Sequence, residues 1–131
     1  MANRLNITDA STLGENSPVF VLELLTERIT VRELIRSRVY QEVKDYNAKQ
    51  PEYFRGLVQP TEAEQTLNGY RLKKRRQISW ETQFEQALKA FQTNGFIVLV
   101  DDEQVDDLEQ EIEVLPETQV TFLKLVALVG G

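Results

Sequence analysis

The stretch "VTFLKLVALVGG", Val120–Gly131, joins a strongly apolar run to two glycines. Its first seven residues, Val120–Val126, carry apolar side chains on both faces of an extended chain, which is typical of a strand buried in a sheet. A buried strand does not require the two glycines that follow, Gly130 and Gly131. We therefore expect a last strand and then a flexible tail at about residues 127–131.

The first 27 residues predict a β-hairpin. "RLNITDA" (4–10) alternates apolar and polar residues, and "VFVLELLTE" (19–27) has the β-branched and aromatic content of a strand. Between them, "STLGENSP" (11–18) is rich in the residues that favour turns.

A helix is expected directly after this hairpin. Thr30 and Glu33 have the spacing of a capping box, in which each side chain bonds a backbone N–H group at the start of a helix. Pro51 disfavours helical geometry at the residue before it, so the helix should end nearby. Apolar residues at helical spacing predict the buried side, namely Val31, Leu34, Ile35, Val39, Val43 and Tyr46. Charged residues are expected on the surface, namely Arg32, Glu33, Arg36, Arg38, Glu42 and Lys44.

The segment from Gln50 to Ile78 leaves two alternatives open. Thr61–Glu64 behind Pro60 is compatible with one or two helical turns, whereas Asn68-Gly69 is a hairpin signal. A second helix is clearer, because Ser79 is a suitable N-cap and Asn94-Gly95 a suitable stop. Its apolar stripe consists of Trp80, Phe84, Ala87, Leu88 and Phe91.

The rest of the chain predicts strands joined by polar turns. "GFIVLV" (95–100) is a short apolar run typical of a buried strand, and "DDEQVDDLEQ" (101–110) is an acidic turn region. "EIEV" (111–114) alternates and is expected to form a hairpin with the last strand. We expect the last strand to be central, between the first strand and the others.

Three pieces of this sequence resemble the ubiquitin-like proteins. "ITVRELI" (29–35) is similar to the "TVRELL" that opens their helix, and "FIVLVDDEQV" (96–105) corresponds to their third strand and turn. "VLPETQVTFLKLVALVGG" (114–131) is similar to a closing "DEVTFLPPVAGG". The resemblance is greatest to bacterial sulfur carriers, typified by the small subunit of molybdopterin synthase and the thiamine sulfur carrier, and extends to bacterial ubiquitin-like modifiers.

The resemblance implies an α+β protein with the β-grasp fold, in which a mixed sheet packs on a long helix. We expect one domain over residues 1–131, with an insertion at about 50–94 that contains the second helix. The resemblance covers about residues 4–47 and 95–131, and the insertion is far longer than the corresponding link in compact sulfur carriers.

The resemblance also implies a function for the diglycine. A partner adenylating enzyme would use ATP to activate the Gly131 carboxylate, and Gly130 and Gly131 would pass through its narrow active site because glycine has no Cβ. The activated chain would then be joined to a lysine of a target protein or converted to a thiocarboxylate that gives its sulfur to an acceptor enzyme. No bound cofactor is expected, since the partner uses the ATP.

A second class of function is a non-covalent β-grasp adaptor that never uses its tail. In the first class, the last strand and tail are candidates for docking the activating enzyme, through Leu123, Leu125, Val126, Leu128 and Val129. The alternative is that the insertion covers this face of the sheet. Five cations of "RLKKRR" form either a contact for an acidic partner or a solvated surface, namely Arg71, Lys73, Lys74, Arg75 and Arg76.

Composition limits the remaining possibilities. The chain has no His and no Cys, so it lacks the usual general base, the commonest metal ligand and any disulfide. No carboxylate pair among its 21 acids stands out for catalysis, and residues 101–107 lack the glycine of a calcium loop, so we expect neither an enzyme nor a metal site. A net charge of −6 argues against nucleic acid as a partner. Without a signal peptide or an apolar span, a cytoplasmic protein without a membrane partner is expected.

Overall fold

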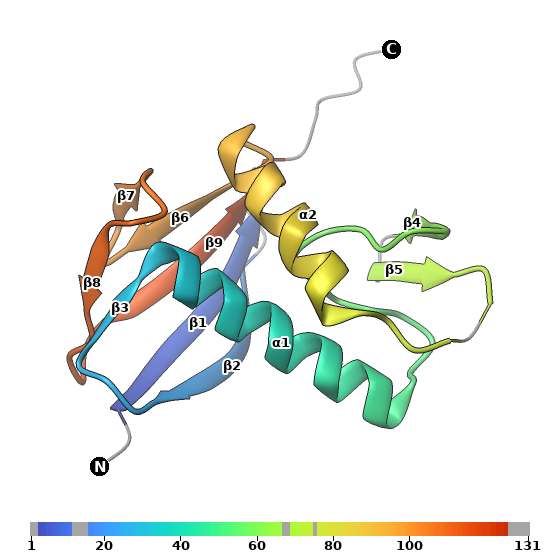
Figure 1. Cartoon of the computed structure of the whole chain (residues 1–131), viewed down its shortest axis with the longest axis horizontal. Coiled ribbons are helices and arrows are strands. Elements are labelled where there is room, and N and C mark those ends of the chain that lie inside the picture. Colours follow the sequence, from blue (N-terminus) through green and yellow to red (C-terminus); the bar gives the residue numbers. More distant parts are fainter. Residues whose placement is uncertain (1–2, 12–15, 67–68, 75, 126–131) are drawn as a thin grey trace. The chain divides into compact units, whose positions relative to one another are not determined.

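The chain folds into an α+β structure with a mixed sheet and two helices (Figure 1). The computed structural model describes residues 3–11, 16–66, 69–74 and 76–125. It divides into two compact units: unit 1 is Met1–Leu34 with Phe91–Gly131, and unit 2 is Ile35–Ala90. Most of the predicted insertion at about residues 50–94 lies within the range of unit 2.

Unit 1 is built around a five-stranded sheet with the order β2-β1-β9-β6-β7. The two central strands, β1 (Asn3–Ser11) and β9 (Gln119–Lys124), are parallel, and the other neighbours are antiparallel. The edge strands are β2 (Asn16–Leu24) and β7 (Glu103–Val105), and β6 (Phe96–Val100) lies between β9 and β7. The prediction that the last strand lies between the first strand and the others is confirmed.

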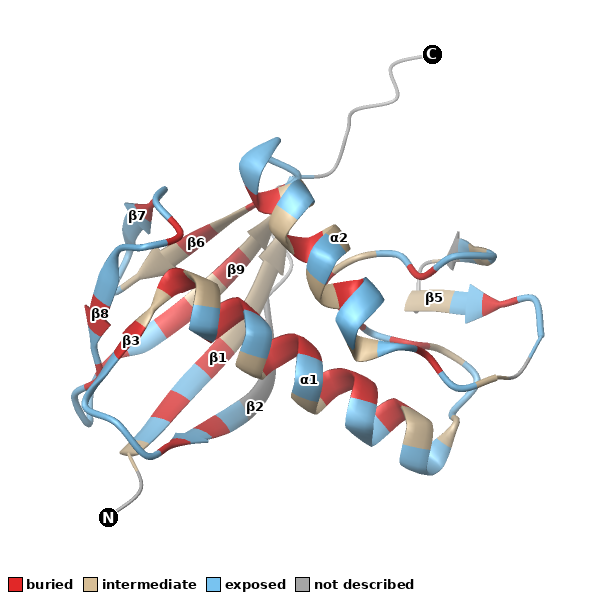
Figure 2. Ribbon diagram, in the orientation of Figure 1, coloured by how far each residue is buried: buried red, intermediate tan, exposed pale blue. Residues whose placement is uncertain are grey.

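One face of this sheet forms the core of unit 1. Val120 and Phe122 of β9 and Leu5 of β1 have no exposed surface, and Ile7 of β1 is 2% exposed. Buried positions alternate with accessible ones along β1 (Figure 2). The Phe122 ring lies 6.0 Å from the Phe96 ring, measured between centroids. Phe96 in turn lies 5.9 Å from Phe91, so three aromatic rings pack in sequence. Burying side chains of this size is the main source of stability in such a core.

Two predictions about the C-terminal strands are wrong. β8 (Glu111–Glu113) pairs with β3 (Arg28–Thr30) and not with β9. This pairing places the buried side chains of Ile29 and Ile112 opposite each other, which favours it over a hairpin. The acidic stretch 101–110 also contains a strand, β7, whose Val105 is buried.

Both helices begin where the capping signals predict. α1 (Val31–Lys49) starts after Thr30, whose Oγ1 accepts a hydrogen bond from the Glu33 N–H at 3.1 Å. α2 (Trp80–Gln92) follows Ser79, and Asn94 has the positive φ of 60° that ends a helix. The predicted apolar positions of α1 are buried, namely Val31, Leu34, Ile35, Val39, Val43 and Tyr46.

Arg38 and Glu42 of α1 are not on the surface, which corrects the sequence-based assignment. Their side chains are 0% and 6% exposed, and Arg38 Nε lies 3.2 Å from Glu42 Oε2. Glu42 Oε1 also accepts a hydrogen bond from the Leu57 N–H at 3.1 Å. The charges are tolerated because they pair with each other and because the carboxylate also bonds the backbone.

The segment between the helices contains a hairpin and not helical turns. β4 (Ala63–Thr66) and β5 (Gly69–Leu72) are antiparallel, as the Asn68-Gly69 signal indicates. Gly69 has a φ of +126°, and a Cβ there would lie 3.0 Å from the Phe54 carbonyl oxygen. Phe54 forms a β-bridge with Tyr70, so residues around Phe54 extend the hairpin.

The first hairpin is also confirmed, with a change in its limits. β1 and β2 pair antiparallel, but β2 begins at Asn16, inside the stretch expected to turn. The packing of α1 on this hairpin stays a prediction.

Candidate functional site

The predicted docking residues of the last strand lie partly within the described structure. Leu123 is half-buried in β9, and Leu125, just beyond the strand, is 40% exposed. The Leu125 N–H donates a hydrogen bond to the Gly95 carbonyl oxygen at 3.4 Å. The other proposed residues lie outside the described part of the chain, namely Val126, Leu128, Val129, Gly130 and Gly131.

Leu123 belongs to a partly accessible face of the sheet that we call the outer face. It lies opposite Ile97 of β6, while the neighbouring Leu99 lies opposite Thr121. These side chains are all half-buried, whereas Phe122 on the other face is fully buried. The face continues across β1 and β2 and includes Thr8, Ala10 and Val21.

The outer face is mainly apolar, although no residue on it is fully buried. Val21 is 50% exposed, and Ile97, Leu99 and Leu123 keep part of their surface accessible. A group of accessible apolar side chains is the kind of surface that another protein can cover. The face also carries the exposed Arg4–Glu23 ion pair of β1 and β2, with 3.8 Å between Arg4 Nε and Glu23 Oε1, so it offers charged as well as apolar contacts.

The cationic segment of unit 2 divides into two parts. Arg71, Lys73 and Lys74 are exposed, whereas Arg76 is half-buried. The Arg76 guanidinium donates hydrogen bonds to the carbonyl oxygens of Thr61, two residues before β4, and of its own neighbour Gln77. Arg75 lies outside the described residues. The first three cations are therefore available for a partner, and Arg76 has a structural contact.

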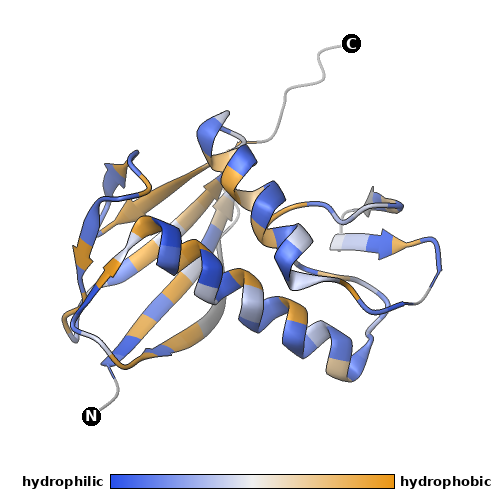
Figure 3. Cartoon of the chain, viewed as in Figure 1, coloured by the Kyte–Doolittle hydropathy of each residue, from blue (hydrophilic) through white to orange (hydrophobic). Residues whose placement is uncertain are grey.

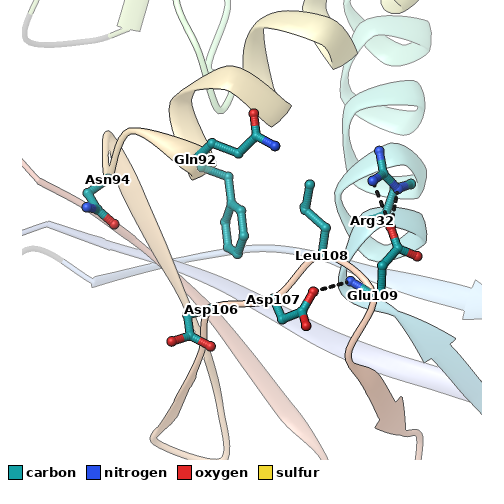
Figure 4. Close-up of a pocket in the computed structure, with 8 residues that line it drawn as sticks. Arg32, Gln92, Asn94, Asp106, Asp107, Leu108 and Glu109 are labelled. Atoms are coloured by element: carbon teal, nitrogen blue, oxygen red, sulfur yellow. Dashed lines mark hydrogen bonds and ion pairs between the residues drawn. The ribbon is translucent and has the colours of Figure 1, made fainter.

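A pocket of about 420 Å³ lies in unit 1 and was not predicted from the sequence (Figure 4). Both Arg32 Nε and Nη2 donate to Glu109 Oε1, at 2.9 and 2.7 Å, while Asp107 Oδ1 accepts from the Glu109 N–H at 2.9 Å. The lining residues are Arg32, Phe91, Gln92, Asn94, Asp106, Asp107, Leu108 and Glu109.

The chemistry of this pocket is limited by its lining. It contains no hydroxyl, thiol or amine that could act as a nucleophile, and Arg32, its one cation, is paired with Glu109. Its residues come from segments far apart in sequence, which explains why sequence patterns did not reveal it. Within the described ranges, no three acidic side chains are grouped closely enough to hold a metal ion.

The helices of the described chain have alternating polar and apolar faces (Figure 3). None of them combines the length and the apolar character needed to cross a membrane. Compared with known proteins, the chain matches no family model, no curated protein and no solved structure.

Proposed function

We propose that this chain is a ubiquitin-like β-grasp carrier or modifier whose Gly131 carboxylate is activated by an ATP-dependent adenylating enzyme. The observation that carries the proposal is the parallel pairing of β1 with β9 at the centre of the β2-β1-β9-β6-β7 sheet. A β-grasp fold has such an order, in which an N-terminal hairpin is followed by a helix and the last strand lies beside the first. The capped start of α1 directly after β3 supports the same reading.

The position of β9 supports a role for the residues that follow it. Lys124, the last residue of β9, is paired on both sides, with Ser11 of β1 and Phe96 of β6. A strand bonded on both sides gives the following segment a fixed starting point. Residues 126–131, when fully extended, reach about 20 Å. This distance is suitable for presenting Gly131 to the active site of another protein.

The proposed chemistry takes place at the Gly131 carboxylate. One carboxylate oxygen attacks the α-phosphorus of ATP, a new P–O bond forms, and pyrophosphate leaves. An amine of a target lysine then attacks the acyl carbon, AMP leaves, and the amine loses a proton to form an isopeptide bond. In the alternative fate, hydrosulfide attacks instead, giving a thiocarboxylate and AMP. Gly130 and Gly131 leave the acyl carbon unhindered in both reactions.

The adenylating enzyme is proposed to dock on the outer face. Leu123 and Leu125 supply accessible apolar surface next to the start of the tail. Val126, Leu128 and Val129 would extend this contact toward the reacting carboxylate. The scaffold itself supplies no catalytic group, and ATP is bound by the partner.

A non-covalent adaptor is the second candidate function. The observation that favours it is the accessible outer face, since Val21 at 50% exposure lies on β2, away from the segment that carries the tail. In this reading, partners bind the sheet and Gly131 has no role.

ATP–pyrophosphate exchange with a purified adenylating enzyme of the kind that activates bacterial ubiquitin-like proteins separates the two functions. We expect exchange with the intact chain, loss of exchange when Gly131 is deleted, and strong loss with Gly130→Val. Glu52→Gln, at an exposed position of unit 2 that is not part of the outer face, is a control that should retain exchange. If the intact chain supports no exchange, the carrier proposal is wrong and the adaptor remains. The intact mass of the protein from cells then distinguishes a thiocarboxylate from a conjugate.

A further inference from the structure

The two units carry opposite charge. Unit 1 contains four Lys or Arg and fourteen Asp or Glu, whereas unit 2 contains eleven Lys or Arg and seven Asp or Glu. Their formal charges are therefore −10 and +4, and the net −6 of the chain conceals a basic unit. In physiological salt, charges interact strongly only within about 8 Å, so local charge determines which ligands a surface attracts. This division alters the expectation drawn from the net charge alone.

The exposed cations of unit 2 are concentrated on the β4–β5 hairpin. Arg71, Lys73 and Lys74 are exposed, and none of them forms an ion pair with another residue that the structure describes. Glu64 lies opposite Arg71 in the hairpin register but is not bonded to it. Three exposed cations within four positions therefore form no ion pair with any residue in the described ranges.

Aromatic side chains follow this cationic segment in the sequence. Trp80, four positions after Arg76, is the first residue of α2, and its ring meets the Tyr40 ring edge-on at 5.4 Å. The Phe84 ring lies 6.4 Å from the Trp80 ring on the same helix, measured between centroids. Tyr40 is 44% exposed, and Trp80 and Phe84 are half-buried. This part of unit 2 therefore offers ring surface to a ligand.

Two further cations lie against the faces of these rings. The Arg36 guanidinium lies 5.2 Å from the centre of the Trp80 ring, and the Lys44 ammonium lies 5.9 Å from the centre of the Tyr40 ring. Arg36, Tyr40 and Lys44 recur every four residues and so share one side of α1. Arg36 and Lys44 therefore add positive charge directly beside the rings of Trp80 and Tyr40.

We propose that unit 2 binds single-stranded nucleic acid, with phosphates on Arg71, Lys73 and Lys74 and a base stacked against the rings of Tyr40 and Trp80. Proteins that bind single strands combine cations that follow the backbone with aromatic rings that stack on bases. An acidic peptide would use the cations but has no flat ring to place on Tyr40. A duplex keeps its bases stacked inside, so it would make no use of the aromatic cluster. The carboxylates near this surface, Glu62, Glu64 and Glu81, keep the expected binding weak and sensitive to salt.

The test is fluorescence anisotropy of a labelled 20-nucleotide oligouridylate, titrated with the full chain at several salt concentrations. Trp80 is the only tryptophan, so its fluorescence reports contact at the aromatic cluster directly. We expect binding that weakens as salt rises, together with quenching of Trp80. Lys73→Glu/Lys74→Glu should weaken binding about ten-fold or more and reduce the salt slope by about 1.4, or about 0.7 for each phosphate contact. Tyr40→Ala should weaken binding about five-fold or more without changing the slope, since it removes a stacking ring.

Arg4→Glu/Arg28→Glu is the matched control. It changes the net charge equally but lies in unit 1, where each arginine has only a long ion pair of 3.8 Å. Its affinity for the oligonucleotide should stay within about two-fold of the parent. Far-UV circular dichroism checks that the variants fold, and Lys73→Gln/Lys74→Gln repeats the test if the charge reversal unfolds the chain.

Three results would overturn the proposal. The first is no binding of the oligonucleotide at low salt. The second is binding that Lys73→Glu/Lys74→Glu and the unit 1 control weaken equally. The third is binding of polyglutamate as tight as that of the oligonucleotide, which would identify an acidic protein as the ligand. Parallel titrations with oligothymidylate and with a duplex separate RNA from DNA and single strands from double strands.

Discussion

Replacing Phe122 by alanine should remove much of the stability of unit 1. The side chain has no exposed surface, and its ring packs on Phe96 at 6.0 Å. In the sheet register it lies opposite Val98 of β6 and Asp9 of β1. A cavity at this position therefore opens at the centre of the sheet, where strands on both sides limit any collapse.

The expected cost follows from this burial. Truncating a buried phenylalanine to alanine costs about 3–5 kcal/mol, of which a ring pair contributes about 0.5–1.5 kcal/mol. Because the Phe122 ring packs on another ring and has no exposed surface, we expect Phe122→Ala to lower the free energy of unfolding by about 4 kcal/mol. Leu123, the next residue, is half-buried on the outer face, and Leu123→Ala should cost about 1–2 kcal/mol.

Urea denaturation followed by far-UV circular dichroism measures both variants. If the free energy of unfolding falls by about 2 kcal/mol per molar urea, Phe122→Ala should lower the urea midpoint of unfolding by about 2 M. Leu123→Ala should lower it by less than about 1 M. The comparison controls for position, because the two residues are adjacent in one strand. If Leu123→Ala costs as much as Phe122→Ala, the outer face is a second core, and the proposed docking surface is wrong.

Three other changes test features of the fold. Glu42→Gln should destabilise unit 2 by about 3 kcal/mol in a urea titration followed by Trp80 fluorescence, because it removes the negative charge that pairs with the buried Arg38 guanidinium. The exposed Glu81→Gln should change stability by less than about 0.5 kcal/mol, and equal effects would contradict the buried pair. Thr30→Ala should cost about 1 kcal/mol in thermal unfolding, since the Glu33 N–H loses its cap, and Thr30→Ser should retain most of the stability. Gly69→Ala should cost about 1–3 kcal/mol because alanine disfavours a φ of +126° and its Cβ would lie 3.0 Å from the Phe54 oxygen; an unchanged urea midpoint would show that this backbone conformation is not required.

The elements that sequence patterns predicted well are those with local signals. The starts of α1 and α2 were found because Thr30 and Ser79 cap the backbone immediately after them. β9 was recognised as a buried strand because Val120–Lys124 has apolar residues on both faces, whereas its central place was expected from the β-grasp resemblance. These signals depend only on neighbours in sequence, so a single chain is enough to show them.

The features that were missed depend on distant partners. β3 and β8 have three residues each, and nothing in "EIE" indicates that it pairs with Arg28–Thr30 rather than with the next strand. Acidic neighbours obscure β7, in which only Val105 is buried. Arg38 and Glu42 have the spacing of a surface pair, and only the fold shows that they are enclosed.

The candidate site was likewise predictable only in part. The accessible position of Leu123 follows from strand alternation, because its neighbour Phe122 faces the core. The contact of Tyr40 with Trp80 joins two helices, and the pocket around Arg32 joins a helix with residues more than seventy positions later. Such arrangements require the tertiary fold, so no sequence period reveals them.

The parallel pairing of β1 with β9 also determines the order in which this protein can fold. Asn6 pairs with Gln119, so more than one hundred residues must be synthesised before the centre of the sheet can close. Unit 2 is a continuous segment, Ile35–Ala90, and is complete well before β9 emerges from the ribosome. At synthesis rates of about 5–20 residues per second, β1 and β2 wait for seconds without their partner strand. Contacts this distant in sequence form slowly, so unit 1 should be the last part of the chain to fold and the part most exposed to aggregation during synthesis.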